Sequence, residues 1–150
     1  MAAPLSAEDR VGIMELIARY AQCIDGGDRD GYAANFVPDA TVEWVNGSVH
    51  GRDEIRAWAG EMMDTGQVGS DPAKVRHFAG LPYITGDGER ASARTYVILF
   101  TLDETGVRVP FVGSYTDTCV RVEGRWLFEK RIIGADLGGF RPNAGRASDA

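Results

Sequence analysis

The spacing of apolar positions predicts that the chain begins with a helix. From Ser6 to about Cys23, apolar side chains return every three or four residues, as on the buried face of an amphipathic α-helix. Ser6 and Asp9 have the spacing of a weak capping box at its start. The apolar stripe of this helix consists of Ile13, Ile17, Tyr20 and Ile24.

Two further helices are expected. Asp25-Gly26-Gly27 ends the first helix, and Asp28 can cap a short second helix that reaches about Asn35. Residues 53–63 place apolar side chains on one helical face, which predicts a third helix. The polar loop at 65–74 can serve as a lid over a site or as an ordinary surface loop.

The rest of the chain has the pattern of turns and strands. Residues 36–39 predict a turn, because proline sets its own φ and stops a helix. Residues 40–45 predict a strand that returns through Asn46-Gly47 to Val49. Four longer strands are expected at 75–84, 91–102, 108–122 and 125–133. Helices followed by antiparallel strands indicate an α+β fold.

Length and composition are those of one globular domain. The chain has 150 residues, of which 44% are hydrophobic and 25% charged. We expect the domain to span residues 1–136, with a flexible tail at 137–150. The longest apolar run, Tyr96 to Phe100, is much too short for a membrane span. Residues 1–6 lack the basic and apolar parts of a secretory signal, so we expect a cytoplasmic protein.

Charge and motifs exclude several classes of partner and chemistry. The net charge of −6 makes nucleic acid and anionic membranes poor partners. With two histidines and two cysteines, and no Cys-x-x-Cys, a structural metal site is not expected. The sequence contains no dinucleotide fingerprint, phosphate-binding loop or Gly-x-Ser-x-Gly motif, so we expect no cofactor.

One strand predicts self-association. Residues 96–100 are apolar at both parities, whereas a strand with one solvent-facing side alternates. Both faces of the sheet are therefore expected to be covered, one by helices or a pocket and the other by a second subunit. The alternative is that one extra helix covers the second face.

Four residues are candidates for chemistry: Tyr20, Asp25, His77 and Arg131. A carboxylate that binds one ring nitrogen of a histidine leaves the other nitrogen as a base near neutral pH. A buried tyrosine can give a proton to a leaving oxygen, and an arginine can hold developing negative charge. The set suits removal of a C–H proton with loss of a small group, or a double-bond shift. Taken singly, each residue also fits a structural role in the core, a cap or the surface.

Seven segments carry a resemblance to a known family. They are Ile17-Ala18-Arg19-Tyr20, Asp25-Gly26-Gly27-Asp28, Phe36-Val37-Pro38-Asp39-Ala40, Gly51-Arg52-Asp53-Glu54-Ile55, Val75-Arg76-His77, Gly113-Ser114-Tyr115-Thr116-Asp117 and Gly124-Arg125-Trp126-Leu127-Phe128. With these segments in this order, the chain resembles SnoaL-like proteins of the nuclear transport factor 2-like superfamily, over residues 7 to about 136. The resemblance implies a conical α+β barrel, in which a curved, mostly antiparallel sheet surrounds a pocket. It also implies a homodimer or homotrimer formed through the outer face of the sheet.

The resemblance also implies roles for particular residues. Asp25, His77 and Arg131 match the constellation of bile-acid 7α-dehydratase and hexachlorocyclohexane dehydrochlorinase, and Tyr20 matches a tyrosine of the former. A tyrosine there favours loss of water, because a leaving hydroxyl needs a proton. The same comparison implies a pocket for an apolar cyclic substrate, lined by Trp44, Tyr96, Ile98, Phe111 and Tyr115.

Other members of the superfamily fit less well. Scytalone dehydratase uses a second, later histidine, and no histidine follows His77 here. Ketosteroid isomerase has an aspartate where this chain has Trp44. The strand carboxylate of polyketide cyclases has a possible counterpart in Asp117, whose direction the pattern leaves open.

We therefore expect a cofactor-independent dehydratase, lyase, isomerase or cyclase with a His77–Asp25 dyad. Two alternatives remain open at this point. One is a small-molecule-binding module without catalysis, because fold alone does not confer function. The other is a subunit of a larger assembly, since the small subunits of ring-hydroxylating dioxygenases share this fold.

Overall fold

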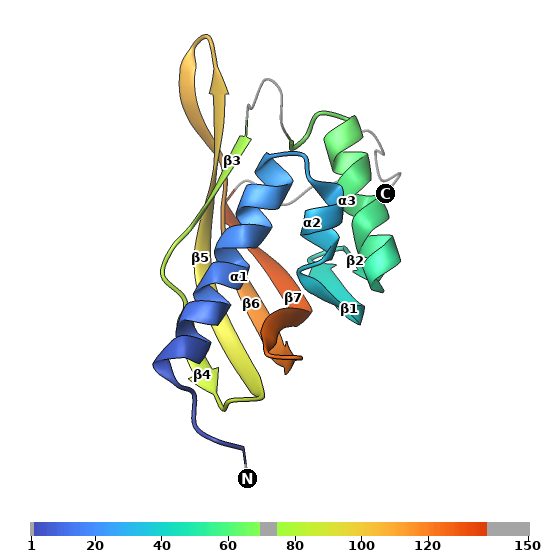
Figure 1. Ribbon diagram of the computed structural model, residues 1–150. Coiled ribbons are helices and arrows are strands. Elements are labelled where there is room, and N and C mark those ends of the chain that lie inside the picture. Colours follow the sequence, from blue (N-terminus) through green and yellow to red (C-terminus); the bar gives the residue numbers. More distant parts are fainter. Residues whose placement is uncertain (1, 70–74, 138–150) are drawn as a thin grey trace.

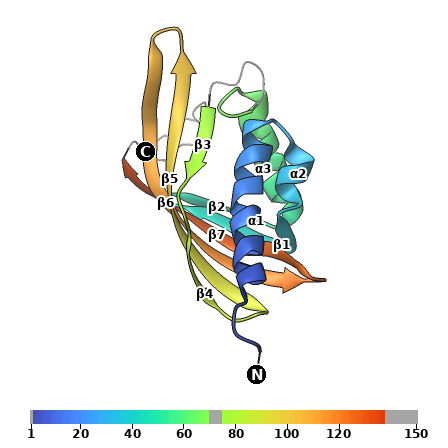
Figure 2. The ribbon, with the colours of Figure 1, turned by 60° about the vertical axis from the view of Figure 1, so that its left-hand side comes forward.

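In the described part of the chain, three helices lie on one side of a curved, unclosed sheet (Figures 1 and 2). The computed structural model describes residues 2–69 and 75–137. The helices are α1 (Ala7–Asp25), α2 (Arg29–Ala33) and α3 (Arg52–Asp64). The strands are β1 (Phe36–Trp44), β2 (Gly47–His50), β3 (Val75–Ala79), β4 (Tyr83–Gly86), β5 (Arg90–Asp103), β6 (Gly106–Val122) and β7 (Arg125–Leu137). The α+β architecture is confirmed.

The sheet has the order β2-β1-β7-β6-β5-β3, and β4 pairs with β5 beside β3. Every pair is antiparallel except β1 with β7, which run parallel. α1 packs against β3 and β7, and α3 packs against β1 and β2. The core fills the space between this helical layer and the sheet. In the described part of the chain, no helix has the length and apolar character needed to cross a membrane.

The start of α1 is the capping box that the sequence predicts. The Asp9 N–H donates to Ser6 Oγ at 3.0 Å, and the Ser6 N–H donates to Asp9 Oδ2 at 2.9 Å. The helix continues to Asp25, two residues beyond the expected end at Cys23. The N–H of Gly26 then closes the last turn by donating to Gln22 O.

The prediction of a turn at residues 36–39 is wrong, because this segment is the first part of β1. Phe36 pairs with Phe128 of β7, and the pairing slips in register before Thr41. The exposed Pro38 and Asp39 lie within this slip. A proline that does not have to donate in a regular ladder is compatible with a strand.

The predicted hairpin forms, but its turn lies one residue earlier than expected. Gly47 is the first residue of β2 and pairs with Trp44, so Val45 and Asn46 make the turn. Packing against Trp44, and not the turn, explains why residue 47 is a glycine. A Cβ atom at this position would lie 2.7 Å from the Trp44 indole.

The long strand expected at 75–84 is two strands, β3 and β4, separated by Gly80, Leu81 and Pro82. Pro82 has no N–H to donate to a ladder of strand hydrogen bonds, which explains why the strand is interrupted there. The expected tail at 137–150 lies outside the described residues, apart from the backbone of Leu137. The loop at 65–74, for which a lid and an ordinary surface loop were both open, is described only to residue 69.

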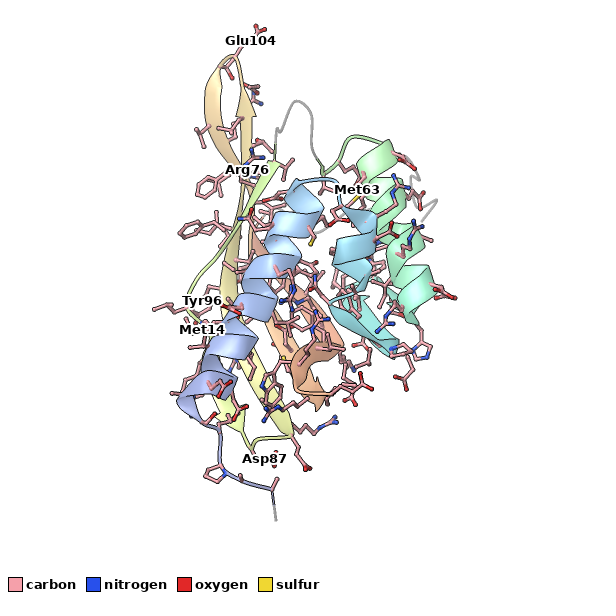
Figure 3. All side chains as sticks on the ribbon, in the orientation of Figure 1. Met14, Met63, Arg76, Asp87, Tyr96 and Glu104 are labelled. Carbon is pink, nitrogen blue, oxygen red and sulfur yellow. The ribbon has the colours of Figure 1, made fainter. Side chains whose placement is uncertain are left out.

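The two faces of β5 differ in what covers them. Ala91, Ala93, Thr95 and Val97 alternate toward the helices and are buried. Tyr96, which is labelled in Figure 3, lies on the other face. Its exposed fraction is 78%. Exposed apolar side chains from neighbouring segments are Phe78, Leu81 and Tyr83. That a second subunit covers this face remains a prediction.

Candidate functional site

The last residue of α1 and the middle residue of β3 make a two-point contact. Asp25 Oδ1 lies 2.6 Å from His77 Nδ1, and Asp25 Oδ2 accepts the backbone N–H of His77 at 2.9 Å. The two side chains are 11% and 7% exposed, respectively. β3 is an edge strand, so this N–H can point away from β5 and toward the helix. The carboxylate therefore fixes both the position and the orientation of the imidazole.

This contact determines which ring nitrogen of His77 is available for chemistry. A carboxylate accepts a hydrogen bond, so Nδ1 carries the proton that faces Asp25. In the neutral ring, Nε2 then has the lone pair. The hydrogen bonds and ion pair that the described residues make to the His77 ring involve Nδ1 and not Nε2. The arrangement can accept a proton at Nε2 while Asp25 stabilises the resulting imidazolium.

Tyr20 and Asp25 face different neighbours, although both lie on α1. Five residues of ideal helix separate their directions by about 140°. Tyr20 points into the core and is 2% exposed, whereas Asp25 reaches the edge strand. The helix does not have to end near Cys23 for Asp25 to reach His77. Asp25 meets His77 from the final helical position.

Tyr20 lies among aromatic rings at the centre of the molecule. Its ring centroid is 4.8 Å from that of Tyr32 and 5.8 Å from that of Tyr115. The ring of His77 lies at 6.4 Å, nearly perpendicular. The Tyr32 hydroxyl donates to the Tyr20 hydroxyl oxygen at 3.1 Å. Burial raises the pKa of Tyr32 and of Tyr115 well above its usual value, so both stay protonated.

Arg131 is fully buried and is held by Asp117. Arg131 Nε and Nη2 donate to Asp117 Oδ1 and Oδ2 at 2.7 and 2.8 Å, and both side chains are 0% exposed. Burial acts to lower the pKa of Arg131, but the charge and hydrogen bonds of Asp117 outweigh it and raise that pKa. The guanidinium carbon lies 4.1, 3.8 and 4.2 Å from the ring centroids of Tyr20, Tyr115 and Phe128.

The direction of Asp117, which the sequence pattern leaves open, is thus toward the core and onto Arg131. The sequence pattern did not predict their pairing. The turn at Glu123-Gly124 pairs Val122 with Arg125, and an unbroken register from there would place Asp117 opposite Lys130. A register shift between Thr118 and Cys119 places Asp117 opposite Arg131 instead. Two nitrogens of Arg131 bind Asp117, and the third, Nη1, has no hydrogen-bond partner among residues 2–69 and 75–137.

The five residues expected to line the pocket do not share a face. Tyr115 and Phe111 are buried on the helix-facing side of β6, where Phe111 pairs with Leu99 and Leu99 with His77. Tyr96 and Ile98 lie on the opposite face of the sheet. The expectation that Tyr96 and Ile98 line the same pocket as Tyr115 and Phe111 is therefore wrong. The sequence does not reveal which face of a strand points inward when both faces are apolar.

Trp44 lies on β1, at the other side of the sheet, where it stacks on Trp58 of α3. The two ring centroids are 5.1 Å apart and the planes are inclined by 8°. The described contacts therefore place Trp44 between β1 and α3.

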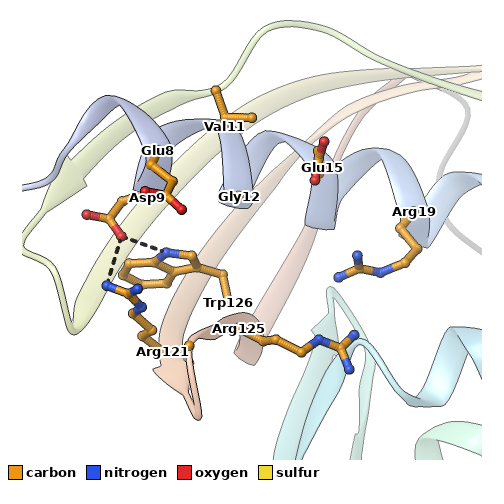
Figure 4. Close-up of a pocket in the computed structure, with 10 residues that line it drawn as sticks. Glu8, Asp9, Val11, Gly12, Glu15, Arg19, Arg121, Arg125 and Trp126 are labelled. Atoms are coloured by element: carbon orange, nitrogen blue, oxygen red, sulfur yellow. Dashed lines mark hydrogen bonds and ion pairs between the residues drawn. The ribbon is translucent and has the colours of Figure 1, made fainter.

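The described residues form grooves on both sides of α1. One of about 280 Å³ runs between α1 and the segment from β3 to Pro82, and His77 and Gln22 are its polar lining residues. The other, of about 330 Å³, lies where the start of α1 meets the turn between β6 and β7 (Figure 4). Trp126 Nε1 donates there to Asp9 Oδ1 at 3.2 Å, and Arg121 lies 3.4 Å from the same oxygen. The second groove contains none of the candidate residues.

Neither thiol of the chain has the surroundings of a nucleophile. Both cysteines are free, and burial raises the pKa of Cys23 and of Cys119. Within residues 2–69 and 75–137, no three His, Cys, Asp or Glu side chains are grouped so that they could hold a metal ion.

Solved structures share this fold. An NTF2-like protein with a cystatin-like fold from Novosphingobium aromaticivorans is 27% identical, with a TM-score of 0.75 over 88% of this chain and 84% of that one. Aln2 from a Streptomyces species is also 27% identical, with a TM-score of 0.77 over 89% and 94% of the two chains. A candidate scytalone dehydratase from N. aromaticivorans is 23% identical, with a TM-score of 0.72 over 94% and 96%.

No curated protein matches the chain. The family model of the SnoaL-like domain, in contrast, matches residues 5–132, which contain every candidate residue described above. The curved sheet, the N-terminal helices and the NTF2-like neighbours agree with that match. The chain therefore belongs to the SnoaL-like family.

Proposed function

We propose that the protein is a cofactor-independent acid–base enzyme that eliminates water from, or isomerises or cyclises, an apolar cyclic small molecule. The observation that carries the proposal is the two-point contact of Asp25 with His77. A carboxylate that bonds Nδ1 and the backbone N–H together orients an imidazole more firmly than one bond does. It leaves Nε2 as the proton acceptor.

The reaction begins at Nε2 of His77. This atom takes a proton from a carbon next to an electron-withdrawing group, and the C–H electron pair forms a new carbon–carbon double bond. In an elimination, the hydroxyl on the neighbouring carbon leaves with its bonding pair and takes a proton from Tyr20, which makes water. The imidazolium proton returns through solvent to the Tyr20 phenolate. The net change is loss of one water from the substrate.

Arg131 contributes a fixed positive charge to this region. It lies against the Tyr20 ring, and the part of the chain that the structure describes provides no hydrogen-bond partner for its Nη1. We expect it to stabilise negative charge that develops on oxygen during the reaction.

The surroundings of His77 support an apolar substrate. Leu99 and Phe111 follow His77 across the sheet, and Tyr115 lies on the same face of β6. Small-molecule sites are mostly apolar, with a few placed polar groups. The candidate scytalone dehydratase, which shares the fold, is named for the same class of chemistry.

The test is a screen against cyclic β-hydroxy carbonyl compounds, whose dehydration gives a conjugated product that absorbs in the ultraviolet. With a compound that is turned over, His77→Gln is expected to lower kcat by about 10²-fold or more. His50→Gln is the matched control, since His50 is the other histidine of the chain and is exposed on β2. Equal turnover by wild type and His77→Gln would end the assignment of the base.

A second candidate function is binding without turnover. One observation favours it, namely that Asp117 already neutralises Arg131 and satisfies two of its nitrogens. Equal binding of an apolar cyclic compound by wild type and His77→Gln, with no product formed by either, would support this candidate.

A further inference from the structure

We propose that Tyr32 and Asp117 are positioning residues that prepare Tyr20 as a proton donor. This inference rests on the acid role of Tyr20 in the proposed function and extends it to two residues that touch Tyr20 or its cation rather than the substrate. Two independent observations carry it, one at the hydroxyl group of Tyr20 and one at the face of its ring.

The first observation is the hydrogen bond between two buried tyrosines. Tyr32 is 0% exposed, lies on α2, and donates its hydroxyl proton to the Tyr20 oxygen at 3.1 Å. Because that oxygen accepts, the proton of Tyr20 itself must point elsewhere. The same bond strengthens when Tyr20 gives its proton away, since bonds to a charged oxygen are the stronger ones.

The second observation is the buried ion pair beneath the ring. The guanidinium carbon of Arg131 lies 4.1 Å from the Tyr20 centroid, and Asp117 holds that guanidinium by two bonds. A buried ion pair is weak support for stability, because apolar residues of similar volume often do as well. A positive charge against the ring, in contrast, directly favours the form of Tyr20 that has lost its proton. Asp117 keeps the cation in that place.

The residues around the Tyr20 ring come from several helices and strands. Tyr32 comes from α2, Tyr115 from β6, Arg131 from β7 and His77 from β3. The charged groups one step further away are Asp117, which binds Arg131, and Asp25, which binds His77. Tyr115 meets the same guanidinium, but the described residues provide no hydrogen bond from Tyr115 to Tyr20.

The experiment reads the ionisation of Tyr20 without a substrate. Tyr20→3,5-difluorotyrosine introduces a phenol that ionises at lower pH than tyrosine, and fluorine NMR follows its titration in the folded protein. The titration is repeated in Tyr32→Phe and in the paired variant Asp117→Asn/Arg131→Gln, which removes both charges and leaves neither unpaired. Tyr83→Phe on the outer face and Glu129→Gln in the exposed Arg90–Glu129 pair are the controls.

We expect the midpoint to move to higher pH by about one unit in Tyr32→Phe, a tenfold change in the ionisation constant. The paired variant is expected to shift it in the same direction, and neither control is expected to shift it. Circular dichroism and the thermal midpoint establish that each variant is folded. If a test variant does not fold, Tyr32→3-fluorotyrosine provides the second measurement, since a more acidic donor at position 32 lowers the midpoint.

A Tyr20 titration that is the same in wild type, Tyr32→Phe and the paired variant would overturn the inference and leave Tyr20 as a core residue. Because no substrate is present, this outcome is separate from the test of His77. A shifted titration together with full turnover by His77→Gln would contradict the proposed base while the positioning of Tyr20 stands.

Discussion

The carboxylate of Asp25 holds His77 at two points, 2.6 Å from Nδ1 and 2.9 Å from the backbone nitrogen. One group thereby joins the end of a helix to an edge strand and sets the tautomer of a nearly buried imidazole. A cap on the helix alone does not require the contact to Nδ1. The geometry therefore suits a base that must keep one orientation through a reaction.

Asp25→Asn is expected to keep the fold and weaken this orientation. The two donors bind different oxygens of Asp25, Nδ1 at Oδ1 and the backbone N–H at Oδ2. In an amide, one of these two positions is an NH2 group, which donates and cannot accept. We expect the His77 tautomers to become mixed, which nitrogen-15 NMR of the ring measures directly. Turnover of a substrate found by the screen is expected to fall by about tenfold or more. A ring spectrum identical to that of wild type would contradict this account.

Removing one partner of the Asp117–Arg131 pair should cost much more stability than removing both charges. Asp117→Ala leaves a buried guanidinium unpaired, and such changes cost about 3–5 kcal/mol. Asp117→Asn/Arg131→Gln leaves no unpaired charge and is expected to cost less. Urea unfolding of the three proteins measures the difference. Glu129→Gln, in an exposed pair, is the control, with an expected cost of at most about 1 kcal/mol.

Asp9 predicts a pH-dependent part of the stability. The pKa of the Asp9 carboxyl lies below its ordinary value of 3.8. Hydrogen bonds from the backbone and side chain of Ser6 lower it most, and the Trp126 hydrogen bond and the Arg121 charge lower it further. A carboxyl whose pKa is lower in the folded state stabilises the fold above its unfolded pKa. This stabilisation is lost as the pH falls through the pKa of Asp9 in the folded state.

Asp9→Asn should therefore reduce the free energy of unfolding at neutral pH, and this reduction should become smaller at acidic pH. Urea unfolding across this range checks it, and an effect independent of pH would show that the charge is irrelevant.

The outer face of the sheet predicts a homo-oligomer. Phe78, Tyr96, Tyr83 and Leu81 are between 62% and 85% exposed on or beside this face. Exposed apolar side chains gathered in this way mark interaction surfaces. We expect Tyr96→Asp to convert a dimer or trimer into a monomer, measured by light scattering after size exclusion. Val45→Asp is the control, because Val45 is also highly exposed but lies in the turn between β1 and β2. A wild-type monomer would refute the prediction.

The amino-acid sequence by itself determined the elements and the chemistry available to them. Local signals such as the Ser6–Asp9 capping box and the apolar stripe of α1 depend on neighbours in the chain, so they could be predicted. The SnoaL-like fold followed from several such segments in order. The same segments contain Asp25 and His77, which were predicted as site residues and which the structure brings into contact.

Only the tertiary structure decided what depends on pairing between distant strands. Pro38 stands in a strand because β1 slips in register along β7, and no local rule contains that slip. Tyr96 and Ile98 face away from Tyr115 because strand pairing, not composition, assigns the two faces of β5. Asp117 became the partner of Arg131 for the same reason. A buried charge is stable only when paired, and the pairing exists only once the strands have joined.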